Sequence, residues 1–353
     1  MALDRVSPCK YMGEGYPALR TKSAIRRSHR AGTSRSPILR SVAGNTFITP
    51  CALTRRLLIS PRLNSSSSGN LKKREPSVAK QVAKNRVALI CTGAAPGLTN
   101  LLAKRGAELL DTVESIQFRL YESTEGKDPI STWSPDVAFE AAVSRPRVYR
   151  NGRFQMAKRF GEPEKFRFPP PLGETTVYLA AQDEVCMLPY VVPMRDADAK
   201  IGGNDFDRLR RWYRQGRLNR SQGLVRKRFP KTPTPRQVAA LIRRGVLENA
   251  RFAATVLVRG RKDDEPLLVR WDANFPTLYQ IRQRGLVSTP ISYATAHLAS
   301  LFIKHFPRDS AGVIGPATLP IDARRAILSE ARSRDVRISL KITKLKKTEE
   351  EEF

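Results

Sequence analysis

The sequence predicts an α/β protein in which a mixed, largely antiparallel sheet is packed by helices. Short apolar or alternating runs, which are typical of strands, interleave with longer segments whose apolar residues recur at helical spacing. Two pairs of predicted strands are joined by tight polar turns, and such turns connect antiparallel neighbours. Hydrophobic residues make up 41% of the 353 residues, which is enough to fill a globular core.

Residues 1–85 form a basic leader that we expect to be disordered. They contain 17 Lys and Arg against three acidic residues, a run of serines at Ser65–Ser68, and no sustained hydrophobic period. This composition is typical of an organellar transit peptide. The alternatives are a leader without a function and residues wrongly included at the start of the gene model.

Order is predicted to begin at Arg86, and residues 86–342 are expected to form one domain. The first elements are a strand over Val87–Cys91, a turn over Thr92–Gly97, a helix over Leu98–Leu110 and an alternating strand over Thr112–Tyr121. A short helix from Trp133 to Val143 follows, then a hairpin within Arg147–Gln155 whose turn is Asn151-Gly152, and then a strand over Thr176–Ala180.

A second basic segment, residues 205–248, is predicted to be helical. It holds 13 of the 63 Lys and Arg residues against three acidic ones. Its apolar residues Phe206, Leu209, Trp212 and Tyr213 recur at helical spacing, which predicts one buried face with the arginines on the solvated side. Arginines interleaved with aromatic residues also fit an RNA-binding surface, and this is the alternative interpretation.

The C-terminal part is predicted to close the domain. Its elements are an antiparallel pair of strands over Asn249–Arg259 and Leu267–Trp271 with a turn at Arg261–Glu265, helices over Pro290–Lys304 and Ala323–Asp335, a last strand over Val336–Ile342, and a charged tail over residues 343–353.

Cysteine, histidine and hydropathy patterns exclude several classes of protein. The four cysteines lie far apart and there are only three histidines, so neither a disulfide framework nor a zinc site is predicted. No run of 18 or more apolar residues exists, so we expect no membrane partner. These patterns favour a soluble protein of a reducing compartment, either the cytoplasm or an organelle such as the mitochondrion or plastid.

The glycine turn at Gly93–Gly97 has to be compared with a dinucleotide site, because a glycine turn before a helix can bind phosphate through backbone amides. Its pattern is G-A-A-P-G rather than G-x-G-x-x-G, its proline removes one amide donor, and no acidic residue ends a strand about 20 residues later. We therefore expect a structural or substrate-facing turn.

Four polar residues outside the turn are weaker candidates. On a strand, Asp183 and Glu184 would face opposite sides, so only one of them could bind a substrate ammonium group; the alternative is a solvated or capping residue. Lys200, before Ile201-Gly202-Gly203, could bind a carboxylate or be an ordinary surface lysine. His297 lies on an apolar helix face and is expected to be a packed core residue.

The order of several short motifs resembles the C-terminal, substrate-binding domain of saccharopine-dehydrogenase-like proteins, a family that includes saccharopine reductases and lysine dehydrogenases. The motifs are Gly93-Ala94-Ala95-Pro96-Gly97-Leu98-Thr99-Asn100, Thr132-Trp133-Ser134-Pro135, Val148-Tyr149-Arg150-Asn151-Gly152, Asp183-Glu184 with Leu188-Pro189, Lys200-Ile201-Gly202-Gly203, and Gly312-Val313-Ile314-Gly315-Pro316.

The resemblance implies an α/β domain that binds an amino acid such as saccharopine or lysine, often dimerises, and works with an NAD(P)-binding Rossmann domain. It places substrate contacts at Pro96, Gly97, Asn100, Trp133, Ser134, Glu184 and Lys200, and it leaves the catalytic residues unassigned. Residues 1–85 contain no G-x-G-x-x-G turn. We therefore expect the Rossmann domain to be absent from this chain, and we do not expect this chain alone to bind NAD or NADP.

Two functions follow from these observations. The first is the substrate-binding and dimerisation part of an NAD(P)-dependent oxidoreductase acting on a CH–NH donor, completed by a Rossmann domain on a separate chain or by residues missing from a truncated sequence. The second is a scaffold without enzymatic activity, whose basic segments associate with RNA.

Overall fold

The computed structural model describes residues 87–127, 141–217, 235–308, 310, 312–333 and 335–345. The basic leader, the short helix predicted to begin at Trp133, and most of the charged tail lie outside these residues, apart from the helical residues 141–143. The expectation that a Rossmann domain is absent rests on residues 1–85, which also lie outside the described ranges.

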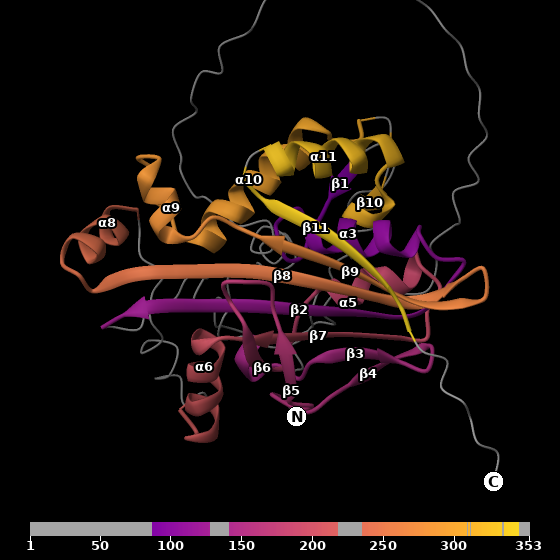
Figure 1. Ribbon diagram of the computed structural model, residues 1–353, viewed down its shortest axis with the longest axis horizontal. Helices are drawn as coiled ribbons and strands as arrows, with labels where there is room; N and C mark the ends of the chain where they lie inside the picture. Colours follow the sequence, from indigo (N-terminus) through magenta and orange to yellow (C-terminus); the bar gives the residue numbers. More distant parts are fainter. Residues whose placement is uncertain are drawn as a thin grey trace, which may run out of the picture.

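A nine-stranded sheet forms the centre of the molecule (Figure 1). Its main path runs in the order β11-β9-β8-β2-β7-β3-β4, and β6 and β5 extend it beside β7. These strands are β2 (Thr112–Gly126), β3 (Arg147–Arg150), β4 (Arg153–Met156), β5 (Glu164–Arg167), β6 (Glu174–Leu179), β7 (Asp196–Gly202), β8 (Leu247–Lys262), β9 (Glu265–Asn274) and β11 (Arg337–Lys344). Among the described strand pairs of this sheet, only β2–β7 is parallel, so the predicted mixed, largely antiparallel sheet is confirmed.

The alternation of side chains along β2, which pairs with the long strand β8, shows which face of the sheet is apolar and buried by helices. Ile116, Phe118 and Leu120 point to one side of β2 and are fully or almost fully buried, whereas Gln117 and Arg119 point to the other side. β2 continues five residues past the predicted end at Tyr121, because its pairing with β8 extends to Gly126.

Helices cover the face that carries Ile116 and Phe118. α3 (Leu98–Ala107), α10 (Pro290–Lys304) and α11 (Ile321–Ser333) supply apolar side chains to the main core cluster, together with α5 (Glu184–Met187) and the 3₁₀ helices η2 (Leu188–Tyr190) and η3 (Pro316–Thr318). α3 lies very close to the sheet at Gly106, where a Cβ atom would stand 2.8 Å from a methyl group of Val258. The predicted bounds of α10 are confirmed.

A separate two-stranded parallel sheet joins the first strand of the domain to a strand in its C-terminal part. β1 (Val87–Leu89) pairs with β10 (Gly312–Ile314), and the Ile90 amide extends the ladder by donating to the Ile314 carbonyl at 2.9 Å. The segment after β1 leads through the glycine turn into α3, as predicted.

Both predicted turns between antiparallel strands are confirmed. Asn151 and Gly152 connect β3 to β4 with φ values of 49° and 74°, and Asp263 and Asp264 connect β8 to β9 with φ values of 49° and 59°. Positive φ at both central residues is the geometry of a type I′ turn, which matches the twist of the paired strands.

The basic segment is helical in α6 (Asn204–Arg214) and α8 (Pro235–Arg243), but it is not helical at its end, where Leu247 and Glu248 begin β8, and residues 218–234 lie outside the described ranges. Phe206 and Leu209 are buried, as predicted. The prediction for Tyr213 was wrong, because its side chain is 36% exposed at the last turn of α6, where it contacts Phe160 at the edge of the domain. None of the helices within the described ranges is both long and apolar enough to cross a membrane.

Candidate functional site

The structure brings together four of the seven residues that the resemblance assigned to substrate. Pro96, Gly97 and Asn100 form the turn before α3 and its first helical turn, and Glu184 lies against them at the start of α5. Trp133 and Ser134 lie outside the described residues. Lys200 lies elsewhere, on β7.

The glycine turn is closed by its own hydrogen bonds. The amides of Gly93 and Leu98 donate to the carbonyls of Pro96 and Gly93, both at 3.0 Å, and the Thr99 amide donates to the Ala94 carbonyl at 3.1 Å. The Gly97 amide donates to Asn100 Oδ1 at 3.1 Å. These amides would be the phosphate ligands of a dinucleotide site, but here they are already used within the turn.

Gly97 is required by the geometry of this turn. Its φ is 142°, and a Cβ atom at this position would lie 1.9 Å from the Gly93 carbonyl oxygen. Only a residue without a side chain allows the two backbone segments to approach this closely.

Asn100 connects the turn to α5. Its Oδ1 accepts from Gly97, and its Nδ2 donates to the Glu184 carbonyl oxygen at 3.2 Å. The side chain is fully buried, so both halves of its amide need partners, and both have them. Asn100 therefore fixes the position of the Glu184 backbone relative to the α3 N-terminus.

Glu184 is a fully buried carboxyl group that lies in a short helix and not on a strand. Neither of its carboxyl oxygens has a hydrogen-bond partner in another residue among those described. Burial raises the pKa of Glu184 to about 8, with a smaller upward contribution from Asp183, while its own backbone amide lowers it. The group is therefore mainly protonated at pH 7, and among the described residues no donor other than its own backbone amide and no positive charge lowers its pKa.

Lys200 belongs to a different cluster of charges. Its Nζ lies 2.9 Å from Glu164 Oε2 and 3.9 Å from Glu162 Oε2. Burial raises the pKa of Glu164, but the hydrogen bonds and charges of Arg119 and Lys200 outweigh it and hold that pKa below its usual value. Lys200 is thus already neutralised by protein carboxylates.

Arg119 completes this buried ion-pair network. Its guanidinium group is fully buried, lies 2.5 Å from Asp198 and 2.8 Å from Glu164, and makes these contacts from β2. Arg150 adds a third positive charge, at 3.0 Å from Asp198 and 3.1 Å from Glu162. Three positive and three negative groups therefore balance one another on this face of the sheet.

The ion-pair network and the Asn100–Glu184 cluster lie on opposite faces of the sheet. Ala199 and Ile201, the neighbours of Lys200 on β7, point into the apolar clusters on the helix-covered side, so Lys200 points to the other side. Asn100 and Glu184 belong to the helix layer. One small substrate cannot contact all of the predicted residues in this arrangement.

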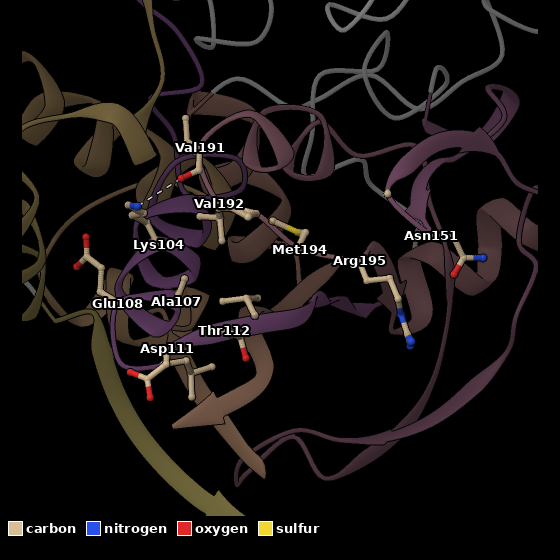
Figure 2. A pocket seen from close by; sticks show the side chains of 14 residues that line it. Lys104, Ala107, Glu108, Asp111, Thr112, Asn151, Val191, Val192, Met194 and Arg195 are labelled. Carbon is tan, nitrogen blue, oxygen red and sulfur yellow. Dashed lines mark hydrogen bonds between the residues drawn. The ribbon is translucent and has the colours of Figure 1, made fainter. Parts of the chain in front are cut away.

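An open groove of about 650 Å³ lies elsewhere on the helix layer (Figure 2). Lys104, Glu108 and Asp111 line it from the end of α3 and the segment after it, and residues 151–152 and 191–195 complete it. Sequence reasoning missed this groove because its lining comes from segments far apart in the chain.

The charged groups of the groove are already paired. Lys104 Nζ donates to the Val191 carbonyl at 3.4 Å (Figure 2), and Glu108 lies 2.5 Å from Arg324. Asp111 accepts from the Asp263 amide at 2.8 Å, and this bond together with Lys262 lowers its pKa. Within the part of the chain that the structure describes, no group of three His, Cys, Asp or Glu side chains could hold a metal ion.

Comparison with known proteins identifies a similar fold but gives no evidence of activity. No protein-family model matches the sequence, and no curated protein matches it significantly. The architecture is that of a saccharopine-dehydrogenase-like α/β fold. The apo histidine-tagged saccharopine dehydrogenase (L-Glu forming) from Saccharomyces cerevisiae is similar with a TM-score of 0.52, over 79% of this chain and 78% of that chain, at 12% sequence identity. This similarity shows a distantly shared fold.

Proposed function

We propose that this chain is the amino-acid-binding part of an NAD(P)-dependent oxidoreductase that acts on a CH–NH donor such as saccharopine or lysine. The observation that carries the proposal is the buried carboxyl group of Glu184, which has no partner in another of the described residues and lies beside the glycine turn of a fold similar to saccharopine dehydrogenase. A nucleotide-binding domain supplies the nicotinamide in this proposal, whether on a separate chain or elsewhere in a longer protein.

Glu184 is suited to bind a substrate ammonium group. An ammonium group brings both a positive charge and N–H donors, and these are what the buried carboxyl group lacks among the described residues. Binding would lower the pKa of Glu184 and release its proton. Asn100 acts as a positioning residue, because it holds the Glu184 backbone through the 3.2 Å hydrogen bond.

The reaction itself requires little from this domain. A nicotinamide held by the nucleotide-binding domain would supply hydride transfer to or from the amine-bearing carbon. The domain contributes by holding that carbon in place, and correct orientation alone provides a large part of the rate enhancement of such reactions.

Calorimetric titration of the full chain with saccharopine and with L-lysine tests the proposal. Asn100→Ala, Trp133→Ala and Glu184→Ala should each weaken binding, whereas Glu174→Ala, at a position whose side chain is 45% exposed on β6, should leave it unchanged. A parallel fluorescence titration with NADH and NADPH shows whether this chain holds a nicotinamide by itself. Equal affinity in all three site variants would contradict the site assignment.

RNA association is a second candidate function, which the arginines of α6 favour. Arg211 and Arg214 are exposed, and Arg211 falls on the side of the helix opposite buried Phe206 and Leu209. Phosphate contacts by exposed arginines give binding that weakens steeply with salt. A filter-binding titration with single-stranded RNA should show this salt dependence and a loss of affinity in R211A/R214A, and salt-independent retention would contradict this function.

A further inference from the structure

β11 is the edge strand of the large sheet, and its outer edge has no partner strand among the described residues. It pairs along its whole length with β9, from Arg337 opposite Asn274 to Lys344 opposite Leu267. Figure 1 shows β11, in yellow, running along one margin of the sheet towards the C-terminal end of the chain. An unpaired edge of eight residues exposes a row of backbone donors and acceptors that can pair with another strand.

The apolar side of β11 continues the protein core but is left uncovered. Ile338, Leu340 and Ile342 pair with Ala273, Trp271 and Val269 of β9, which are buried under the helices. Leu340 is nevertheless 41% exposed and Ile342 is 50% exposed. Two large aliphatic side chains on an open edge are unusual for a strand that faces only water.

The opposite side of β11 is polar and basic. Arg337, Ser339 and Lys341 alternate with the apolar residues and are all exposed. Negative side chains are lacking on this strand, whose sequence is RISLKITK. A partner strand must therefore present apolar residues on one side and, on the other, an uncharged or acidic residue directly opposite each basic one.

A second copy of β11 meets these requirements in one register. A two-fold axis normal to the sheet makes the two edge strands antiparallel and keeps each face on its own side. With the axis at Leu340, Leu340 lies opposite the partner's Leu340, and Ile338 lies opposite the partner's Ile342. On the basic side, Arg337 then lies opposite the partner's Thr343, and Ser339 lies opposite the partner's Lys341.

Shifting the axis by one residue destroys this match. An axis at Lys341 places two lysines directly opposite each other, and an axis at Ser339 places Arg337 opposite the partner's Lys341. Like charges directly opposite each other destabilise a pair of strands. The register at Leu340 avoids both pairs, and within Arg337–Lys344 it overlaps as many residues as the register at Lys341 and more than the register at Ser339.

We propose that β11 joins two copies of this chain, pairing antiparallel with its own copy about Leu340 to form one continuous sheet. This interface is independent of the proposed activity, because none of its residues belongs to the Asn100–Glu184 cluster. Its two basic rows repel each other across the interface, so salt, which screens exposed charges, should strengthen the dimer. RNA binding would have the opposite salt dependence.

Sedimentation equilibrium of the full chain tests the interface. Wild type should be a dimer at about 100 µM and should dissociate less at high salt. Leu340→Arg, which places two arginines opposite each other, should be monomeric at the same concentration. Ile303→Arg on α10 is the matched control, because Ile303 is 73% exposed and belongs to a helix rather than to the edge strand, and it should leave the dimer intact.

Two further variants test the register. Ser339→Glu places a carboxylate opposite the partner's Lys341 at two symmetric positions and should tighten the dimer by roughly two- to thirty-fold. Leu340→Cys should cross-link to itself on oxidation, because directly opposite residues have Cβ atoms about 5 Å apart. Thr343→Cys, which faces the partner's Arg337, should cross-link no more than wild type. A wild-type chain that stays monomeric at both salt concentrations, or a dimer that Leu340→Arg leaves intact, would overturn the proposal.

Discussion

At the residue scale, burial of the Glu184 carboxyl group lowers the stability of the protein and also leaves that group able to bind a ligand. Its carboxyl group lies in the helix layer without a hydrogen-bond partner among the described residues, and it stays neutral because burial raises its pKa to about 8. A buried carboxyl group that has no structural partner is a candidate for binding or catalysis. Asn100, by contrast, is equally buried but fully hydrogen-bonded, and its role is to hold the backbone around Glu184.

Replacing Glu184 with glutamine should change how stability depends on pH. The pKa of Glu184 is about 8 in the folded state against an ordinary 4.5, so the folded state binds the proton more tightly. The free energy of unfolding of wild type therefore falls as pH rises from about 4.5 towards 8, by roughly 3 kcal/mol at pH 7 from this group alone. Glu184→Gln removes this loss.

Urea unfolding at several pH values measures the effect. Glu184→Gln should be more stable than wild type at pH 8 and close to wild type at pH 4.5. Glu174→Gln, at an exposed position, serves as the control and should follow wild type throughout. If the difference between Glu184→Gln and wild type is the same at both pH values, Glu184 is not neutral in the folded protein.

At the scale of elements, short-range sequence signals such as turn residues and helix caps correctly predicted the turns and helices that they stabilise. The Asn151-Gly152 turn can adopt positive φ at both central positions, and the helix over Pro290–Lys304 begins with a threonine cap and a proline at its first position. β7 was missed, because its alternation of Asp and Ala has low strand propensity, and the strand is stabilised by pairing with β2 on one side and with β3 and β6 on the other.

Substituting glycine in the turn before α3 should disrupt the element that positions the candidate site. Gly97→Ala places a Cβ atom 1.9 Å from the Gly93 carbonyl oxygen, so the turn must open and Asn100 must lose its hydrogen bond to the Gly97 amide. Gly152→Ala is the control: its φ is also positive at 74°, but nothing lies within 4 Å of the added methyl group. We expect about 1 kcal/mol of destabilisation for Gly152→Ala.

Thermal unfolding and substrate titration of the two glycine variants distinguish a local from a general effect. Gly97→Ala should unfold at a markedly lower temperature than Gly152→Ala and should bind saccharopine or lysine more weakly. Similar unfolding temperatures for the two variants would mean that the close approach of Gly93 and Gly97 is not required.

At the scale of the whole molecule, the sheet separates two clusters that the sequence could not separate. The motif order predicted Asn100, Glu184 and Lys200 as parts of one site, yet Lys200 points to the face opposite the helices and is paired with Glu164. Which face a strand residue occupies depends on the register of the whole sheet, and β7 was not predicted. The ion-pair network around Arg119 was hidden for the same reason, since its members come from several strands.

The last strand could be predicted from the sequence, but its position at the edge of the sheet could not. Alternating apolar residues predicted the last strand over Val336–Ile342, and the structure places it at Arg337–Lys344. Its position at the margin of the sheet, which leaves Leu340 and Ile342 exposed, follows from the strand order alone. The proposed dimer interface therefore depends on topology and could not be inferred from local sequence.

Proton release on substrate binding tests the central claim most directly. Calorimetric titration of the full chain with saccharopine or lysine at pH 7, in two buffers with different ionisation enthalpies, counts the protons that leave the protein. Wild type should release roughly one proton per bound ligand, because the ammonium group lowers the pKa of Glu184, and any binding that Glu184→Gln retains should release none. Binding of normal affinity with no proton released would contradict the assignment of Glu184 to the substrate ammonium group.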